Sequence, residues 1–277
     1  MQDRYVPDLG DFSKFIVINA LATGGDGVVG ASLRVGLVWY RVDLGEVNND
    51  GSHTAYLEAH GSERQRYRAC WPSGYDRLRR LWRDVQRGRV KREVSVYRRR
   101  RVMGGCEPVV YVEDRLDVSG LPGVAERRTL REAWLAKAVD RVSGCGLVVL
   151  DPDNGLSVKS VSPWSVRGVK YATPEECAAL AGGEGAVGAV GGERSLVVYQ
   201  HATRRGTLAE QADRGLKRLA DATGQPRHSG FALVFRHGPC RLYLVVPASG
   251  HADTLRERAE RMTQPSDSRS AFFSLIR

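Results

Sequence analysis

Apolar residues in this chain occur in short continuous runs that end in polar or acidic residues. Three such runs lie at 33–40, 146–150 and 195–199, and a fourth, at 107–114, ends in two acids. A continuous apolar run of this length predicts a strand that is covered on both faces, as in a parallel sheet between helices. The pattern therefore indicates an α/β protein.

The segments between these runs carry apolar residues at helical spacing. This spacing predicts helices over 8–22, 75–87, 127–142, 207–223 and 252–262. Another helix is predicted to begin at Thr173, because Thr173 and Glu176 form a capping box and Pro174 occupies the first turn. The alternation of strands and helices predicts a single Rossmann-like α/β domain over 1–277, with a mostly parallel sheet.

The last third of the chain predicts a different kind of strand pairing. Apolar runs at 231–235 and 240–246 are separated by Arg-His-Gly-Pro, which favours an antiparallel hairpin that closes the sheet. A short strand is expected at 271–276, after the last helix.

The most informative stretch is the polar end of the central strand. The run at 146–150 is followed by Asp151, Pro152, Asp153, Asn154 and Gly155. Open α/β sheets bind ligands at the carboxyl ends of their strands, so Asp151, Asp153 and Asn154 are candidate catalytic residues. The alternative is that Asp-Pro-Asp-Asn-Gly is only a turn sequence.

Other polar residues fall at comparable places. Tyr199, Gln200 and His201 end the strand at 195–201, and Arg204 and Arg205 follow. We expect Tyr199, Gln200 and the two arginines to contact substrate, and His201 to take part in catalysis.

Two further candidates lie in the first fifth of the chain. Lys14 falls in the first turn of the helix at 8–22, where a cation opposes the helix dipole. This position indicates an anionic neighbour, and the alternative is an ordinary surface lysine. Asp50, with Asn49 and His53, lies on a loop beyond the first strand and is a second site candidate, although Asn-Asp-Gly is also common in turns.

A basic segment at about 60–105 is predicted to form an insertion of one helix and a strand near 94–97. Residues 64–101 contain fifteen Lys or Arg against three acids. Arg98, Arg99, Arg100 and Arg101 are candidate phosphate contacts. Aromatic residues interleaved with the basic ones suit a groove that stacks bases, and the alternative is a solvated helix face whose aromatics are core. These aromatics are Tyr67, Trp71, Tyr75, Trp82 and Tyr97.

The composition narrows the class of partner. The 277 residues carry a net charge of +10, which indicates nucleic acid or another phosphate-rich anion, although Arg-rich chains can also be basic without such a partner. Five cysteines without a CxxC pair indicate reduced thiols rather than disulfides or structural zinc. No apolar run approaches a membrane span, so we expect a soluble, cytoplasmic protein without a membrane partner.

The predicted order of elements, with its terminal hairpin, resembles the class I methyltransferase-like fold, and above all the bacterial enzymes that methylate adenine N6 in ribosomal RNA. Their first helix carries Gly, Asn or Asp, and Lys, which here are Gly10, Asp11 and Lys14. Their Asp-Pro-Pro-Tyr motif aligns with the segment from Asp151 to Asn154. The chain also resembles a set of bacterial proteins with the patterns GDFxK, WY, NxDG, DPDNG and YQHxxR, which imply no particular function.

The methyltransferase resemblance implies S-adenosylmethionine as the cofactor and a nucleic-acid base as the acceptor. It implies that Asp151 and a backbone carbonyl accept hydrogen bonds from the base amino group. Asp153 and Asn154 replace the second proline and the aromatic residue of the motif. This replacement favours an alternative, in which Asp151, Asp153 and Asp50 bind Mg²⁺ in a metal-dependent phosphodiesterase or nuclease. A third possibility is a non-catalytic nucleic-acid-binding module.

Overall fold

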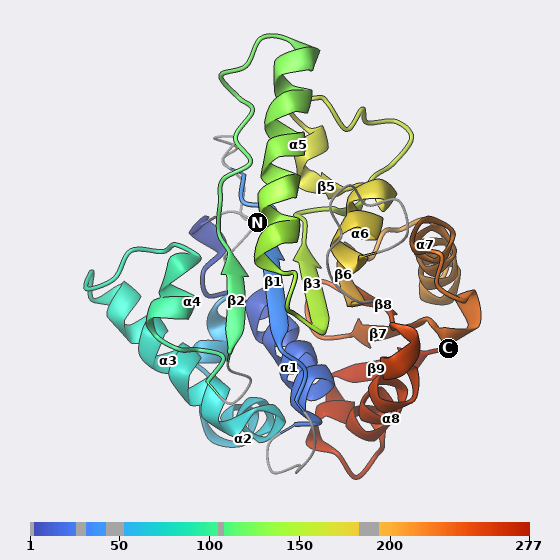
Figure 1. Ribbon diagram of the computed structural model, residues 1–277. Coiled ribbons are helices and arrows are strands. Elements are labelled where there is room, and N and C mark those ends of the chain that lie inside the picture. Colours follow the sequence, from blue (N-terminus) through green and yellow to red (C-terminus); the bar gives the residue numbers. More distant parts are fainter. Residues whose placement is uncertain (1–2, 26–31, 43–52, 105–107, 183–193) are drawn as a thin grey trace.

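The computed structural model describes residues 3–25, 32–42, 53–104, 108–182 and 194–277, and it has an α/β architecture with one central sheet (Figure 1). Seven strands form this sheet in the order β2-β1-β3-β6-β8-β7-β9. Their bounds are β1 (Val35–Trp39), β2 (Val109–Val112), β3 (Leu147–Asp151), β6 (Ser195–His201), β7 (Phe231–Phe235), β8 (Arg241–Val246) and β9 (Phe273–Ile276). A separate pair, β4 (Gly155–Leu156) and β5 (Tyr171–Ala172), follows the central strand.

The sheet is mostly parallel, as the continuous apolar runs predict. Strands β2, β1, β3 and β6 are parallel to one another, whereas β8 is antiparallel to β6 and β7 is antiparallel to β8. The predicted hairpin is therefore present, but the prediction that it closes the sheet is wrong, because β9 pairs with β7 and forms the edge. Every residue of β7 and β8 is buried, whereas only the first of the four residues of β9 is. This difference suits β9 to an edge position.

Helices cover both faces of the sheet. One face packs against α1 (Leu9–Thr23), α2 (Gly61–Cys70), α3 (Pro72–Gln86), α4 (Ser95–Arg99) and α8 (Ala252–Thr263). The other packs against α5 (Val124–Arg141), α6 (Pro174–Ala181) and α7 (Leu208–Thr223). The alternation along β1 and the residue after it separates the two cores, since Leu37 and Trp39 belong to the first and Val38 and Tyr40 to the second. Short 3-10 turns lie at Asp3–Tyr5, Ala55–Leu57, Gly168–Lys170, Arg227–Ser229, Ser249–His251 and Ser268–Ala271.

Helix α1 is the most deeply buried helix of the described chain, because residues 9–22 are all buried. Its start is fixed by a reciprocal cap. The Asp8 carboxylate accepts from the backbone N–H of Asp11 (3.0 Å), and the Asp11 carboxylate accepts from that of Asp8 (3.3 Å). The cap satisfies donors that a buried helix end would otherwise leave without partners.

The basic segment between β1 and β2 differs from its prediction. Residues 94–97, expected as a strand, belong to a turn and to helix α4. The β-branched residues Val94 and Val96 favour a strand locally, but both are buried in the core beneath the sheet, and this packing decides the conformation.

None of the described helices has the length and apolarity needed to cross a membrane.

Two roles were predicted for the aromatic residues of the basic segment, base stacking and core packing, and the structure distinguishes between them. Tyr67, Trp71, Tyr75 and Tyr97 are buried in the core that includes Phe12 and Phe15 of α1. Buried rings are not accessible to nucleic-acid bases. The prediction that these four side chains stack on bases is therefore wrong. The alternative prediction, that they pack in the core beneath a basic helix face, is confirmed.

Candidate functional site

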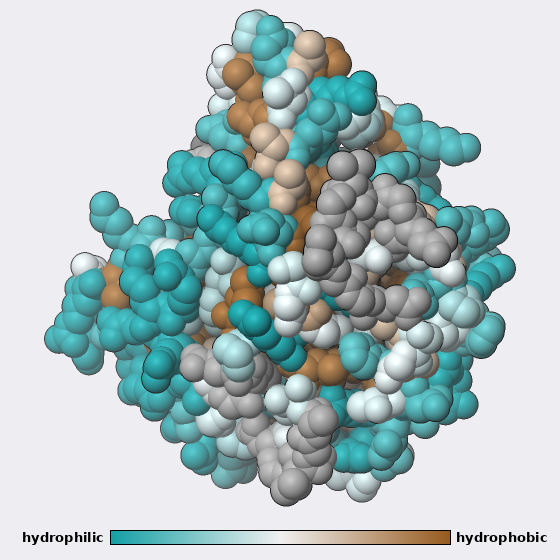
Figure 2. All heavy atoms as spheres, in the orientation of Figure 1, coloured by the Kyte–Doolittle hydropathy of each residue, from teal (hydrophilic) through white to brown (hydrophobic). Residues whose placement is uncertain are grey.

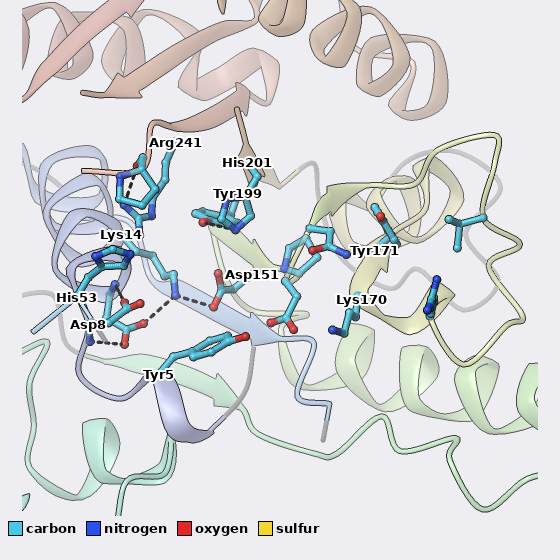
Figure 3. Close-up of a pocket in the computed structure, with 18 residues that line it drawn as sticks. Tyr5, Asp8, Lys14, His53, Asp151, Lys170, Tyr171, Tyr199, His201 and Arg241 are labelled. Carbon is cyan, nitrogen blue, oxygen red and sulfur yellow. Dashed lines mark hydrogen bonds and ion pairs between the residues drawn. The ribbon is translucent and has the colours of Figure 1, made fainter. Parts of the chain in front are cut away.

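A cavity of about 490 Å³ lies at the carboxyl ends of β3 and β6 (Figure 3). Its wall combines the start of α1, the segment after β3, the residues before β5, the end of β6 and the start of β8. Strand β1 has β2 on one side and β3 on the other, so the strand order reverses next to this wall. Open α/β sheets place their ligands at such a reversal.

Charged side chains of both signs line the cavity. The basic ones are Lys14, Arg167, Lys170 and Arg241, and the acidic ones are Asp8, Asp11, Asp151 and Asp153; the imidazoles of His53 and His201 also line the cavity. Three tyrosines, Tyr5, Tyr171 and Tyr199, add aromatic surface (Figure 3). Such a wall suits a polar ligand that carries both positive and negative groups.

The centre of the site is an ion-pair network around Lys14. The Lys14 ammonium donates to Asp151 Oδ2 at 2.6 Å and to Asp11 Oδ1 at 3.0 Å, and all three side chains are buried. The Tyr97 hydroxyl donates to the other oxygen of Asp11. The anionic neighbour expected for Lys14 is thus confirmed, and it comes from a strand end 137 residues along the chain.

Burial and charge act against each other in this network. Burial alone would lower the pKa of Lys14, but Asp151 and Asp11 together raise it, so the ammonium stays protonated. For Asp151 burial dominates and raises the pKa of the carboxyl, although the Lys14 ammonium opposes the shift. Asp151 is therefore a carboxylate with increased proton affinity, held in one position by a fixed cation.

Asp8 lies beside this network, and the pKa of its carboxyl group is also shifted. Burial and the neighbouring Asp11 carboxylate raise its pKa to about 7, while the Arg241 guanidinium opposes the shift. The helix cap and the cavity wall therefore share a carboxyl group that titrates near neutral pH.

A second group of side chains comes from the neighbouring strands β6 and β8. His201 is the cross-strand partner of Arg241. The Tyr199 hydroxyl lies 3.0 Å from His201 Nε2, and burial raises the pKa of Tyr199. Tyr199 is therefore a neutral hydroxyl that orients the His201 ring in the cavity wall.

Gln200 and Asn154 have different roles at the turn that follows β3. Gln200 Oε1 accepts from the backbone N–H of Leu156 at 2.8 Å, and Asn154 donates its own backbone N–H to the Lys170 carbonyl at 3.0 Å. Gly155 has φ +91°, and a Cβ there would lie 2.4 Å from Gln200 Oε1. Gln200 therefore fixes the turn after β3, whereas Asn154 and Asp153 line the cavity.

The predicted arginine contacts lie elsewhere. Arg98, Arg99 and Arg100 are exposed, and each pairs with an acid, respectively Glu113, Glu93 and Asp84. Arg101, which has φ +47°, is exposed beside them. Arg204 and Arg205 are exposed between β6 and α7 and are not among the residues lining the cavity. Asp50 lies outside the described residues.

Several lining residues have no counterpart in the sequence-based prediction. No prediction as a site residue was made for Tyr5, Asp8, Arg167, Lys170, Tyr171 or Arg241. Arg241 has the one usable signal, because it opens an otherwise apolar strand. Its approach to His201 depends on the position of β8 next to β6, which local sequence does not specify.

The geometry also bears on metal binding. Within the described residues, no group of three or more His, Cys, Asp or Glu side chains is arranged to hold a metal ion. Asp151 Oδ2 accepts a hydrogen bond from Lys14 and is therefore already paired with a cation.

No family model, curated protein or solved structure matches the chain, so a functional interpretation depends on the geometry of this site.

Proposed function

We propose that the cavity is the active site of a nucleic-acid-directed methyltransferase that uses S-adenosylmethionine. The observation that carries the proposal is the contact between Lys14 and Asp151. These residues belong to the two segments on which the resemblance to base methyltransferases depends, Gly10 to Lys14 and Asp151 to Asn154. The fold brings the two segments together at the wall of one polar cavity.

The arrangement of the strands supports the same proposal. In the methyltransferase-like fold the distinctive element is a terminal antiparallel hairpin, and here β7 and β8 form a hairpin whose second strand pairs with β6. Asp151 ends β3, which lies between β1 and β6 in the parallel part of the sheet. Rigid strand ends favour transfer reactions, because the rate depends on alignment of acceptor and donor.

The residues of the cavity fit the cofactor. When bound, S-adenosylmethionine supplies an electrophilic methyl group. Its amino-acid portion carries an ammonium and a carboxylate, and the wall offers acids such as Asp8 and Asp153 together with the cation of Arg241. The tyrosines of the wall provide flat apolar surface for adenine.

Asp151 would act on the acceptor base. Lys14 holds Oδ2 of this carboxylate, and Oδ1 together with the Pro152 carbonyl would accept the hydrogens of the base amino group and orient its lone pair. The raised pKa of Asp151 increases its ability to receive the proton that the amine loses on transfer. Tyr5 or Tyr171 would stack on the base, in place of the aromatic residue that Asn154 replaces.

The test is calorimetric titration of chelator-treated protein with S-adenosylmethionine, followed by an assay of labelled methyl transfer to RNA and DNA. We expect Asp151→Asn to bind the cofactor within a few-fold of the unmodified protein and to lose transfer by roughly 100-fold or more. The matched control is Asp221→Asn, which changes an exposed carboxylate on α7.

Two results would contradict the proposal. One is the absence of cofactor binding at millimolar concentration. The other is tight binding of Mg²⁺ or Mn²⁺ that Asp151→Asn abolishes, which would instead support the metal-dependent phosphodiesterase. Nucleic-acid binding that is unchanged in Asp151→Asn, without either ligand, would identify a binding module.

A further inference from the structure

Arg241 is a buried cation in the cavity wall with an incomplete set of partners. Its exposed fraction is only 3 %, and it lines the cavity between His201 and the start of α1. Nη1 donates to the Pro239 carbonyl at 2.8 Å, and the guanidinium also interacts with the Tyr199 hydroxyl and with the charge of Asp8, but Nε is buried without a hydrogen-bond acceptor. Within the described parts of the chain, no carboxylate forms an ion pair with this guanidinium.

This arrangement costs free energy in the absence of a ligand. A buried guanidinium loses its hydration, and a neutral carbonyl compensates for that loss less well than an anion does. The aromatic ring of Phe235, whose centroid lies 6.0 Å from the Arg241 Cζ, provides a further but weaker contact. An arginine held in this way is prepared for an anion that comes from outside the chain.

The Arg241 guanidinium packs closely against the start of α1. A Cβ on Gly10 would lie 3.2 Å from Arg241 Nε and 2.9 Å from Asp8 Oδ1, so glycine allows the guanidinium to approach the helix closely. Lys14 and His201 also belong to this part of the wall. The opposing charge of Asp8 is weakened near neutral pH, because burial raises the pKa of Asp8 to about 7.

We propose that Arg241 anchors an oxyanion subsite in this cavity, beside Gly10 and His201, which binds a carboxylate or phosphate group of the ligand. The guanidinium offers planar N–H donors that match such a group. The inference rests on the proposed function only for the identity of the ligand: the anion is then the carboxylate of S-adenosylmethionine or a phosphate of the acceptor nucleotide.

The experiment measures binding of three probes by calorimetry. S-adenosylmethionine carries a carboxylate, AMP carries a phosphate, and adenosine carries neither. We expect Arg241→Gln to weaken binding of one of the two anionic probes by roughly 10-fold or more, while Arg241→Lys weakens it less and adenosine is unaffected. Arg236→Gln is the matched control, since Arg236 is exposed, five residues earlier in the same hairpin, and bonded to Ser274.

The pattern of losses identifies the source of the anion. A loss for S-adenosylmethionine alone identifies the carboxylate, and a loss for AMP alone identifies the phosphate. Equal affinities of Arg241→Gln and Arg236→Gln for both probes would overturn the inference, as would the absence of binding of either anion to the unmodified protein at millimolar concentration. Thermal melting and the Arg241→Lys variant separate loss of the subsite from loss of the fold.

Failure of the subsite and failure of the proposed function give different results. Binding of S-adenosylmethionine that does not depend on Arg241 leaves the methyltransferase proposal intact and removes the subsite. Arg241-dependent binding of AMP, without any binding of S-adenosylmethionine, retains the subsite and removes the methyltransferase proposal.

Discussion

Asp8 combines two tasks that place opposite demands on its charge. As the cap of α1 it accepts a backbone hydrogen bond, which a carboxylate does well, but its burial beside Asp11 favours the protonated form. The folded pKa of about 7 lies above the unfolded value of about 3.9. Between these two values the folded protein holds a proton that the unfolded chain does not. The contribution of Asp8 to the free energy of unfolding is therefore fully present below the unfolded pKa, and it is lost as the pH rises through the folded pKa of about 7.

Asp8→Asn is expected to remove this dependence, because asparagine caps a helix as well as aspartate and stays neutral. The difference in unfolding free energy between the variant and the unmodified protein should shift in favour of the variant between pH 4 and pH 8. The shift has an upper limit of about 4 kcal/mol, from about three pKa units. Urea unfolding at four pH values in this range measures it. A difference that stays constant with pH would contradict the assignment, and Asp221→Asn, at an exposed position, should show no such trend.

Arg131 connects three elements on the far side of the sheet from α1. From α5 it donates to both oxygens of Glu176 on α6, at 2.5 and 2.8 Å. It also donates to the carbonyls of Pro163, Gly168 and Tyr171. The segment 163–171 carries Arg167, Lys170 and Tyr171 into the cavity wall, so this one guanidinium positions a wall of the site without lining it.

Arg131→Met is expected to destabilise the protein by about 3–5 kcal/mol, since it removes the cation that pairs with the buried Glu176 carboxylate and one donor to each of three carbonyls. Hydrogen exchange should increase first in 157–172, while amides of β3 and β6 remain protected. Arg141→Met is the matched control at the end of α5, where the side chain is exposed and pairs with Asp114; its cost should be about 1 kcal/mol or less. Uniform acceleration of exchange along the whole chain would show that Arg131 has no local positioning role.

The same elements show what sequence patterns can and cannot specify. The strands β1, β3 and β6 were predictable because each is a continuous apolar run buried on both faces. Helix α6 was predictable from its capping box, which the structure contains. Helix α2 was not predicted, because only Tyr67 and Cys70 of its ten residues are buried and no apolar periodicity marks it. Residues 94–97 were predicted wrongly because their β-branched side chains reflect core packing.

At the scale of the whole molecule, the site depends on strand order rather than on local pattern. The position of β8 beside β6 sets Arg241 opposite His201, and the packing of α1 on the sheet sets Lys14 against Asp151. Asp151 and Lys14 were predictable as candidates from a strand end and a helix start. Their direct contact was not, because it joins positions 137 residues apart.

The net charge of +10 is also a property of the whole molecule, and its distribution indicates where nucleic acid would bind. Figure 2 shows hydrophilic residues gathered over α3 and α4. Arg80 and Arg83 of α3, together with Arg87 at its C-terminal cap, are exposed at helical spacing and are called the α3 arginines below. Within the described residues, no acid pairs with them. Arg98, Arg99 and Arg100 nearby are partly neutralised by their acids. The α3 arginines are therefore the better candidates for phosphate contacts.

Replacement of Arg80, Arg83 and Arg87 by glutamine is expected to weaken binding of a single-stranded RNA oligonucleotide at low salt. It should also reduce the slope of log affinity against log salt by roughly 2, because each lost phosphate contact removes about 0.7 from that slope. The matched control replaces Arg214, Lys217 and Arg227, which removes the same charge from α7 and the turn that follows it. Equal slopes for the two triple variants would mean that only the net charge matters. A smaller slope for the α3 variant, with unchanged binding of S-adenosylmethionine, would separate a nucleic-acid-binding surface at α3 from the cavity that we propose as the active site.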